Sequence, residues 1–207
     1  MNKLVIIGAG GHGNVVAFAA EESKRYCEIV FIDDVVSTSK TGLKVVGKTK
    51  DIEKFVKDYE FIVAIGDNKF RKEISRKVLE LGGKLTTIIH PSAVVSKYSS
   101  IKEGVFVSAN AVINPFAKIE EGAIINTAAV IEHDCKVGEY THVCPSVSLA
   151  GTVSVGSCCT LGIGTKVINN LEISNDVVLG AGSVVVKDIK ESGTYVGVPV
   201  RKLGTKK

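Results

Sequence analysis

Two histidines in the second half of the chain are placed for acid–base chemistry. His133 lies in the run Glu132-His133-Asp134, and His142 follows nine residues later. An imidazole titrates near neutral pH, so it can take the proton from an amine or hydroxyl that attacks a thioester. A neighbouring carboxylate, Asp134 or Glu132, can orient the ring and stabilise its charged form. The pattern predicts a general base, and a pair of solvated surface histidines is the alternative.

Donors for a tetrahedral oxyanion can come from the same region. The backbone N–H groups of the turn at Ala150-Gly151 and the imidazole of His142 are the candidates, because donors fixed in advance stabilise a developing negative charge. Cys159 is not expected to carry an acetyl group, since it belongs to an inward-facing series of small residues described below.

A glycine-rich loop near the start of the chain has the spacing of a phosphate-binding turn. Residues Gly8-Ala9-Gly10-Gly11-His12-Gly13 satisfy G-x-G-x-x-G between a predicted strand and a predicted helix, and Asp33 stands twenty residues beyond Gly13. Such a loop brings a helix N-terminus to an anionic phosphate. Only about ninety residues precede the repeat described below, too few for a full dinucleotide fold. We therefore predict a site for one nucleotide diphosphate, with a ligand-free structural turn as the alternative.

Polar residues after two further strands can complete that nucleotide site. Asp33 and Asp34 end an apolar strand and can accept hydrogen bonds from a base or a ribose. Asn68 and Arg71 follow the next apolar strand, and we expect them on a loop that closes over the nucleotide.

The first part of the chain alternates short apolar runs with helical segments, which is the pattern of a small parallel α/β unit. The predicted strands cover residues 4–7, 29–32, 61–65 and 85–89, and the predicted helices cover 15–22, 51–56 and 68–81. Asp51 and Asn68 are the expected helix caps. We predict a Rossmann-like domain over residues 1–90 and a second domain over 91–207.

The second half follows a strict period of six. From Val95 to Val185 every sixth residue is Val, Ile or Leu, sixteen times without a break. A second series, four residues after each of these, is mostly small or β-branched and includes Ala111, Cys135 and Thr165. Neither a period of 2 nor one of 3.6 explains this pattern, whereas a hexapeptide repeat does. We predict a left-handed parallel β-helix.

In such a β-helix each hexapeptide forms one side of a triangular coil, and three complete a turn. Sixteen repeats give about five coils at about 4.8 Å each, so roughly 25 Å of prism. The open ends of the stack need caps. The α/β domain is expected to cover one end, and the segment from Lys187 onward the other.

The spacing of the two histidines has a geometric consequence. His133 and His142 are nine residues apart, which is half of an eighteen-residue coil, so they lie on different sides of one prism. They can meet only across an interface between subunits packed side by side. We therefore expect a cyclic homotrimer with its active sites in the clefts between prisms.

Charge and composition argue against several classes of function. The net charge of +4 is spread over Lys and Arg interspersed with Asp and Glu, so we expect no nucleic acid partner. The five cysteines form no C-x-x-C pair, which argues against disulfides and zinc and favours a cytoplasmic setting. The apolar run at residues 4–7 is too short to cross a membrane, and we expect no metal cofactor.

These motifs together make the chain similar to a known family. It resembles the hexapeptide-repeat acyltransferases that acetylate sugar nucleotides and sialic acid, above all the UDP-4-amino-sugar N-acetyltransferases that make bacillosamine-type sugars for bacterial glycans. The likeness covers essentially the whole length. It is carried by residues 7–13, Phe31-Ile32-Asp33-Asp34, Ile65-Gly66-Asp67-Asn68 with Arg71, residues 131–135, His142, Leu149-Ala150-Gly151 and Gly197-Val198-Pro199.

The resemblance implies a homotrimeric acetyltransferase that holds acetyl-CoA between adjacent prisms. It implies that His133 is the base, that Asp134 orients it, and that the acceptor attacks directly without an acyl-enzyme. We assign acetyl-CoA contacts to His142, Gly151, Ile163, Gly180 and Ala181. We assign contacts to a nucleotide-sugar substrate to Gly10, Gly11, His12, Gly13, Asp33, Asp34, Asn68 and Arg71.

Several alternatives remain open on the sequence. The base could serve an O-acetyltransferase acting on sialic acid or another sugar hydroxyl. A zinc β-helix of the carbonic anhydrase type would need three histidines from the prism, and only two are present. A nucleotide-binding scaffold without catalysis and an NAD oxidoreductase are the remaining alternatives.

Overall fold

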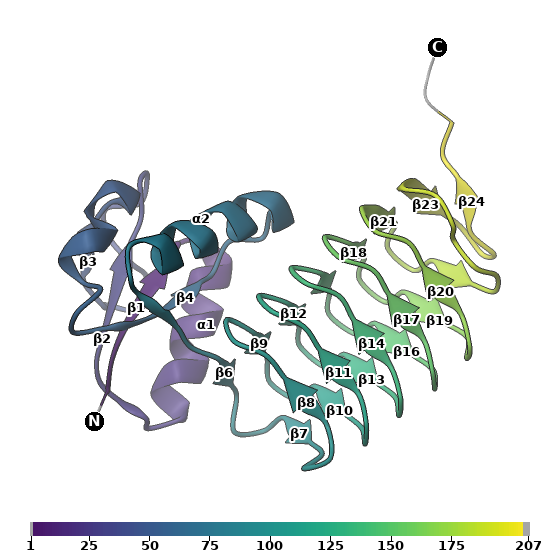
Figure 1. Ribbon diagram of the computed structural model, residues 1–207, viewed down its shortest axis with the longest axis horizontal. Helices are drawn as coiled ribbons and strands as arrows, with labels where there is room; N and C mark the ends of the chain where they lie inside the picture. The colour runs from purple at the N-terminus through teal and green to yellow at the C-terminus, as the bar shows by residue number, and fades with distance from the viewer. Residues whose placement is uncertain (1, 205–207) are drawn as a thin grey trace.

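The computed structural model describes residues 2–204 and consists of an α/β domain at one end of a long triangular prism (Figure 1). The α/β domain has a five-stranded parallel sheet with strand order β3-β2-β1-β4-β5. Its strands are β1 (Asn2–Ile7), β2 (Tyr26–Ile32), β3 (Val45–Gly47), β4 (Glu60–Val63) and β5 (Lys84–Leu85). The order reverses between β1 and β4, and ligands bind to open α/β sheets at such a switch point.

Alternation along β1 divides the core of this domain into two layers. Leu4 and Ile6 pack with helix α1 (Gly11–Glu22), whereas Val5 and Ile7 pack with helix α2 (Asn68–Glu80) and a short 3₁₀ helix (Thr49–Lys54). The α1 layer also contains Phe106 and Ile124 from the prism. Helix α1 therefore lies between the sheet and the first face of the prism, and the two domains share one apolar cluster.

The elements of the α/β domain differ from the predicted ones in several places, and strand β3 was not predicted. Helix α1 begins at Gly11, four residues earlier than expected. The 3₁₀ helix begins after Lys48, and α2 is capped by Asp67, whose carboxylate accepts the Phe70 N–H at 2.8 Å. The predicted strand over residues 85–89 is two strands, because β6 (Ile88–Ile89) pairs with the prism rather than with the α/β sheet. The chain thus enters the prism at β6, and the division after residue 90 stays a prediction.

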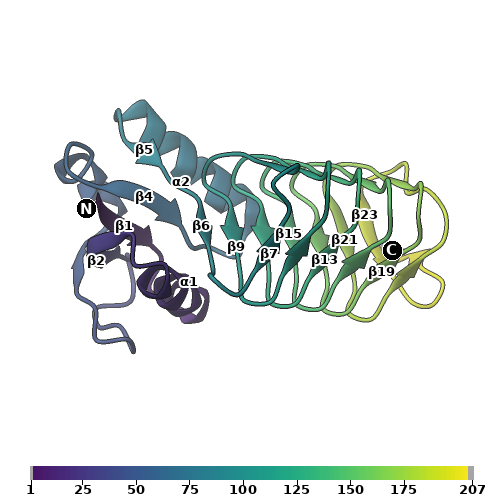
Figure 2. The same cartoon turned by 90° about the horizontal axis from the view of Figure 1, so that it is seen from below.

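The prism has three faces, each a parallel sheet whose neighbouring strands are eighteen residues apart (Figure 2). Face I contains β6, β9 (Phe106–Val107), β12 (Ile124–Ile125), β15 (His142–Val143), β18 (Thr160–Leu161), β21 (Val177–Leu179) and β23 (Gly193–Val196). Face II contains β7 (Val94–Val95), β10 (Val112–Ile113), β13 (Val130–Ile131), β16 (Ser148–Leu149), β19 (Lys166–Val167) and β22 (Val184–Val185). Face III contains β8 (Ser100–Ile101), β11 (Lys118–Ile119), β14 (Lys136–Val137), β17 (Ser154–Val155) and β20 (Glu172–Ile173).

The period of six is confirmed residue by residue. Each of the sixteen strands from β7 to β22 ends on one of the sixteen predicted aliphatic positions, and all but Val95 and Ile101 are buried. The small positions are inside as well, where thiols and hydroxyls bond to the next coil. The Cys135 thiol donates to the Ala150 carbonyl at 3.2 Å, and the Thr141 hydroxyl donates to the Gly156 carbonyl at 2.7 Å. The fold is a left-handed parallel β-helix, as predicted.

The corners of the prism need a left-handed backbone conformation. From Gly104 to Gly182, every sixth residue has a φ between 53° and 72°. Ten of these fourteen corner residues are not glycine, although this conformation costs other residues roughly 1–2 kcal/mol. The segment after Lys187 closes the far end, where Ile189 is buried and Tyr195 and Val200 pack against the core. Strand β24 (Arg201–Lys202) pairs with β23 there.

Candidate active site

His133 and Asp134 form an exposed pair on the corner between faces II and III. The Nδ1 atom of His133 lies 2.9 Å from Oδ2 of Asp134, and the two side chains are 58% and 53% exposed. Asp134 has one of the left-handed corner conformations, with φ of 59°. Short polar residues adopt this conformation readily, and here it lets the carboxylate turn back onto the preceding ring. The pair can therefore work as a base and its orienting group, and among the described residues Nε2 of His133 has no hydrogen-bond partner.

Gly151 lies beside His133 on the next coil of the same corner. A Cβ atom at this glycine would stand 2.6 Å from Cε1 and Nε2 of the His133 imidazole, so only glycine fits under the ring. The Thr152 N–H donates to the His133 carbonyl at 2.9 Å and locks the two coils in register. Within residues 2–204 the Gly151 N–H has no hydrogen-bond partner. It can donate to a ligand that lies against His133.

A groove runs along face II from this point. It has a volume of about 410 Å³, and Ala150, Lys166 and Asn169 are among its lining residues. The Lys166 ammonium donates to the Ser148 hydroxyl at 2.9 Å and to the Ser146 carbonyl at 3.2 Å. A long, narrow ligand could therefore lie in the groove with its reactive end beside Gly151.

His142 stands on face I in a different setting. Its Nε2 lies 3.0 Å from Nδ2 of Asn126, and its ring centroid lies 6.1 Å from that of His12, which in turn contacts Phe106 at 5.5 Å. The Asn126 Oδ1 accepts the Thr127 N–H at 2.8 Å, which fixes the direction of the amide. The amide N–H therefore donates to Nε2 of His142, and the proton of the neutral ring lies on Nδ1.

Burial keeps both of these histidines neutral. Burial and the nearby charge of Arg71 lower the pKa of His12 to about 4. Burial, Arg71 and His12 lower the pKa of His142 to about 4. At neutral pH each ring can therefore donate one hydrogen bond and accept one, and neither carries a charge.

One chain cannot bring His133 and His142 together. The His133 corner joins faces II and III, so it is the corner opposite face I, which carries His142. Gly151 lies on the His133 corner, and therefore it is separated from His142 as well. The structure thus places the predicted base His133 and the predicted acetyl contact Gly151 on one corner, and the other predicted acetyl contact, His142, on the opposite face of the prism.

The remaining predicted acetyl-CoA contacts lie on the corner between faces I and II. Ile163 is 59% exposed, and its carbonyl accepts the N–H of Gly182, which follows Ala181 on the next coil. Gly180 has another reason to be small, because a Cβ there would lie 2.7 Å from Cγ1 of Val196 in the C-terminal strand. An apolar edge containing Ile163 and Ala181 thus runs along the same side as His142.

The glycine-rich loop lies at the switch point of the α/β sheet. Gly10 and Gly11 have open space where a Cβ would stand, so a ligand can approach their backbone. A Cβ at Gly13 would meet the Gly8 carbonyl oxygen at 1.9 Å, which makes glycine necessary for the tight strand-to-helix turn. Helix α1 has no side-chain cap at its start, and an anion could take that role.

Asp33 and Asp34 line a small cavity beside this loop. Asp33 accepts the N–H of Ala9 at 2.7 Å, and Asp34 accepts the N–H and hydroxyl of Thr49 at 2.9 and 2.7 Å. The cavity has a volume of about 170 Å³, and Phe70 is at its edge. The two carboxylates therefore hold the loops in place and still face a space where part of a ligand could lie.

Asn68 and Arg71 do not lie on a loop as predicted. Both belong to α2, which runs along the corner between faces III and I (Figure 1). The Asn68 amide donates to the Cys158 and Cys159 carbonyls at 3.2 and 2.9 Å. Arg71 is 1% exposed, and all its donors are taken up by protein oxygens. Both side chains join the domains, and this leaves Arg71 no donor for a substrate.

Sequence reasoning missed two residues at this site. Asn126 holds the His142 tautomer, and Phe106 packs against His12. A signal for Asn126 was present, since it directly follows β12, and β12 lies eighteen residues before β15, the strand that carries His142. Within residues 2–204 no group of three or more metal-ligating side chains is found. None of the described helices is long and apolar enough to cross a membrane.

Comparison with known proteins identifies relatives for the whole described fold. Residues 3–78 match the family model of the PglD N-terminal domain. The acetyltransferase domain of PglB from Neisseria gonorrhoeae, solved in complex with acetyl coenzyme A, is 37% identical, with a TM-score of 0.95. That match covers 98% of this chain and 100% of that chain. This chain belongs to the hexapeptide-repeat sugar-nucleotide acetyltransferase family.

Two further members of this acetyltransferase family are similar to the chain. PerB from Caulobacter crescentus, solved with CoA and GDP-perosamine, is 39% identical over 99% of this chain and 98% of that one, with a TM-score of 0.94. A UDP-N-acetylbacillosamine N-acetyltransferase from Bacillus subtilis is 36% identical over 116 residues. That alignment covers 53% of this chain and spans about half the length of the relative, 52%. The family resemblance predicted from the motifs is confirmed.

Proposed function

We propose that this chain transfers an acetyl group from acetyl-CoA to the amino group of a nucleotide-linked amino sugar of the UDP-4-amino-4,6-dideoxy type. The observation that carries the proposal is the pair of His133 and Asp134, held against the Gly151 backbone beside a groove. The relative from Bacillus subtilis, named for UDP-N-acetylbacillosamine, supports this substrate class. The product would enter bacterial glycan synthesis.

The proposed chemistry uses two groups on the His133 corner, Nε2 of His133 and the backbone N–H of Gly151. The amine nitrogen attacks the thioester carbonyl carbon, the C–N bond forms, and Nε2 of His133 takes the proton while Asp134 stabilises the imidazolium. The Gly151 N–H, and His142 from a neighbouring subunit, donate to the oxyanion. Collapse of the intermediate breaks the C–S bond, and the CoA sulfur leaves with the proton returned by His133.

The α/β domain would hold the nucleotide. Gly10, Gly11 and Gly13 bring the uncapped start of α1 to the diphosphate, and His12 follows on the side of the prism. Asp33 and Asp34 lie at the small cavity where the base or the ribose would be held. The sugar would then extend from His12 toward face I, where His142 stands 6.1 Å away.

We propose a homotrimer because the site is incomplete in one chain. His133 and Gly151 lie on the corner opposite His142, so a complete site needs the corner of one subunit against face I of the next. A cyclic trimer forms three such clefts by repeating one contact. Ile163 and Ala181 would then line acetyl-CoA from the His142 side, and Gly151 from the other.

Mixed trimers test this sharing. A His133→Ala chain and a His142→Leu chain, each inactive alone, are unfolded together and reassembled at equal concentrations. A cleft is complete only when the chain that supplies His133 still has His133 and the neighbouring chain that supplies His142 still has His142. Random assembly of a cyclic trimer from equal amounts of the two variants gives this in about a quarter of the clefts. Recovery of about that share of wild-type activity supports shared sites. No recovery, with trimers formed, would mean that each chain carries its own site.

Release of the CoA thiol tests the reaction itself. The protein is mixed with acetyl-CoA and a UDP-4-amino-4,6-dideoxy sugar, and His133→Ala is measured beside it. We expect a loss of about a hundredfold or more in the variant, as removal of a general base predicts. Equal rates in the two proteins would remove His133 from the mechanism.

The choice of acceptor distinguishes substrates within the class. Relatives of this chain are named for UDP- and GDP-linked sugars, so GDP- and dTDP-amino sugars are compared in parallel with the UDP sugar. Preference for one of these would keep the enzyme class and change the nucleotide. Release with sialic acid alone would indicate O-acetylation. Release with none of these acceptors would contradict the proposed activity.

We propose that the enzyme works in the cytoplasm. Cys135, Cys144, Cys158 and Cys159 are free thiols, which suits a reducing compartment. Fractionation of cells that express the chain at its natural level would check this, and recovery in the periplasmic fraction would contradict it.

A further inference from the structure

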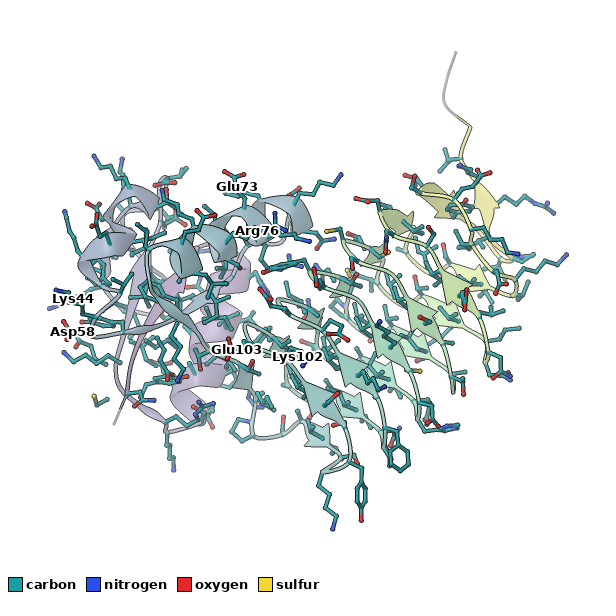
Figure 3. All side chains as sticks on the ribbon, viewed as in Figure 1. Lys44, Asp58, Glu73, Arg76, Lys102 and Glu103 are labelled. Atoms are coloured by element: carbon teal, nitrogen blue, oxygen red, sulfur yellow. The ribbon has the colours of Figure 1, made fainter. Side chains whose placement is uncertain are left out.

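Arg71 is a buried cation without a carboxylate partner. Its guanidinium donates five hydrogen bonds, to the Gly122, Ile65, Gly66 and Tyr140 carbonyls and to the Asn68 side-chain oxygen, at 2.6 to 3.3 Å. Five donors satisfy the group completely, but none of these acceptors carries a negative charge. Arg76, five residues further along the same helix, is exposed (Figure 3). Among the described residues this buried arginine forms no salt bridge.

The position of this charge relates it to the candidate site. The carbonyls of Gly122 and Tyr140 come just before β12 and β15, the strands of face I that lead to Asn126 and carry His142. The guanidinium therefore lies where α2 meets the corner between faces III and I. One of its donors meets the carbonyl of Tyr140, two residues before His142, at 2.6 Å, and its charge lowers the pKa of both His12 and His142, second to burial as a cause.

The charged groups around this point do not cancel the effect on the histidines. Asp67 faces Arg71 from the start of α2, and its carboxylate also caps the helix by accepting the Phe70 N–H. From the prism, Tyr140 and Cys158 face Arg71, and the Tyr140 hydroxyl donates to Glu121 at 2.5 Å. Among the described residues, no acid is among the groups that shift the pKa of either histidine.

The hydrogen bonding around His12 and His142 also disfavours a positive charge on either ring. The Nε2 atom of His12 is buried and has no hydrogen-bond partner among the described residues. His142 accepts from Asn126 on Nε2, a position where a protonated ring would have to donate instead. Protonation of either ring would therefore place a second cation near Arg71 without a new partner for it.

We propose that Arg71 is a positioning residue whose unpaired charge adds to burial in keeping His12 and His142 neutral and disfavours the ammonium form of an amino sugar held against them. An alkylammonium group cannot attack a thioester, because its lone pair is bound to a proton. A cation fixed in the protein raises the cost of a second cation nearby. The bound acceptor would then lose a proton to solvent on binding and enter the reaction as a free amine. This second part of the proposal rests on the proposed function.

Histidine NMR on the substrate-free protein tests the first part. In the wild type we expect the His12 and His142 rings to stay neutral down to about pH 5, since their pKa values are about 4. Arg71→Met removes the charge and should move both titrations to higher pH. Arg71→Lys keeps a charge but loses most of the hydrogen bonds, and should leave both rings neutral at pH 5. Arg76→Met is the control for loss of an arginine from α2.

The outcomes separate charge from packing. Equal shifts in Arg71→Met and Arg71→Lys would mean that the hydrogen bonds matter rather than the charge, and would overturn the proposal. Should Arg71→Met fail to fold, the wild type decides alone, because titration of both rings near pH 6.5 would overturn it. This experiment needs no substrate, so it can succeed even where the proposed activity fails.

The pH dependence of kcat tests the second part. With saturating acetyl-CoA and the amino-sugar acceptor, kcat falls on the acid side when groups in the bound complex become protonated. We expect this limb to move to higher pH in Arg71→Met but not in Arg71→Lys, and a movement of one pH unit lowers kcat by about tenfold on the limb. If the acid side of the pH dependence of kcat is the same in the two variants, with acetyl transfer otherwise intact, then Arg71 does not affect the protonation of the amine.

Discussion

The imidazole of His133 lies directly over the α-carbon of Gly151, one coil further along the prism, so close that a Cβ there would stand 2.6 Å from the ring. Within residues 2–204 the N–H of the same glycine has no hydrogen-bond partner. Packing fixes the inward positions of the repeat. This outward contact between neighbouring coils brings the proposed base and the residue that would donate to the oxyanion together. The geometry makes the glycine as necessary to the site as the histidine.

Substitution of Gly151 by alanine should damage catalysis more than folding. The new methyl group forces the His133 ring away from its position against the backbone, and a misplacement of about 1 Å can cost about a hundredfold in rate. We expect a loss of tenfold or more in kcat, measured by CoA release, with little change in the melting temperature. Thr152→Ala, at the adjacent exposed corner residue, is the control. Full activity in Gly151→Ala would show that the ring can move without consequence.

Asp134 should matter through its charge. Asp134→Asn keeps the size and the corner position but cannot stabilise the imidazolium, so we expect kcat to fall about ten- to hundredfold. Asp176→Asn is a matched control, because Asp176 is another acidic corner residue with φ of 55° that pairs with Lys69 at 3.1 Å. Losses of similar size in both variants would point to corner stability rather than to His133.

Asp33 should contribute stability that depends on pH. Burial would raise its pKa, but hydrogen bonds from the backbone N–H groups of Ala9, Val36 and Val35 outweigh this and hold the pKa below its usual value. A carboxyl with a lowered folded pKa stabilises the protein above its unfolded pKa of about 3.9, and this stability is lost as pH falls through the folded value.

Replacement by asparagine isolates that contribution. Asp33→Asn should lower the free energy of unfolding at pH 7 by about 1–3 kcal/mol, because a buried N–H loses its charged acceptor. Urea unfolding should show the difference from wild type shrinking as pH is lowered from 5 toward 3. Asp58→Asn, at an exposed position, should change little at any pH. A difference that stays constant with pH would mean that the charge of Asp33 is not involved.

The period of six allowed the prism to be predicted strand by strand because one coil repeats one set of contacts. The separation of His133 from His142 followed from the same arithmetic, without knowledge of any side-chain position. The α/β domain has no repeat, so its boundaries depended on single signals. Neighbouring polar residues can each cap the start of a helix, as Asp67 and Asn68 can for α2, and the caps of α2 and the 3₁₀ helix were therefore misassigned.

Arg71 and Asn126 needed the tertiary structure. Nothing in a short polar segment distinguishes an arginine that contacts a substrate from one whose five donors all meet protein oxygens, two of them the Gly122 and Tyr140 carbonyls of the prism. The direction of the Asn126 amide likewise depends on the Thr127 N–H and on a ring from the next coil. Contacts between sequence-distant groups decide these roles, and local patterns do not contain them.

Strain at the corners leads to a final prediction about stability. Ala128 is exposed and has φ of 55°, a conformation that costs an alanine roughly 1–2 kcal/mol and costs glycine almost nothing. Glycine also has more freedom in the unfolded chain, which offsets part of the gain. We expect Ala128→Gly to raise the free energy of unfolding by up to about 1 kcal/mol.

The matched substitution is Ala109→Gly on the coil below, whose carbonyl accepts the Ala128 N–H at 3.0 Å and whose φ is not positive. There glycine relieves no strain and only adds freedom to the unfolded chain, so we expect a loss of about 0.5–1 kcal/mol. Urea unfolding of both variants measures the contrast. Destabilisation of the same size at both positions would mean that the left-handed corners carry no strain in this prism. Opposite signs would locate strain in the left-handed corner conformation, which Asp134 also adopts beside His133.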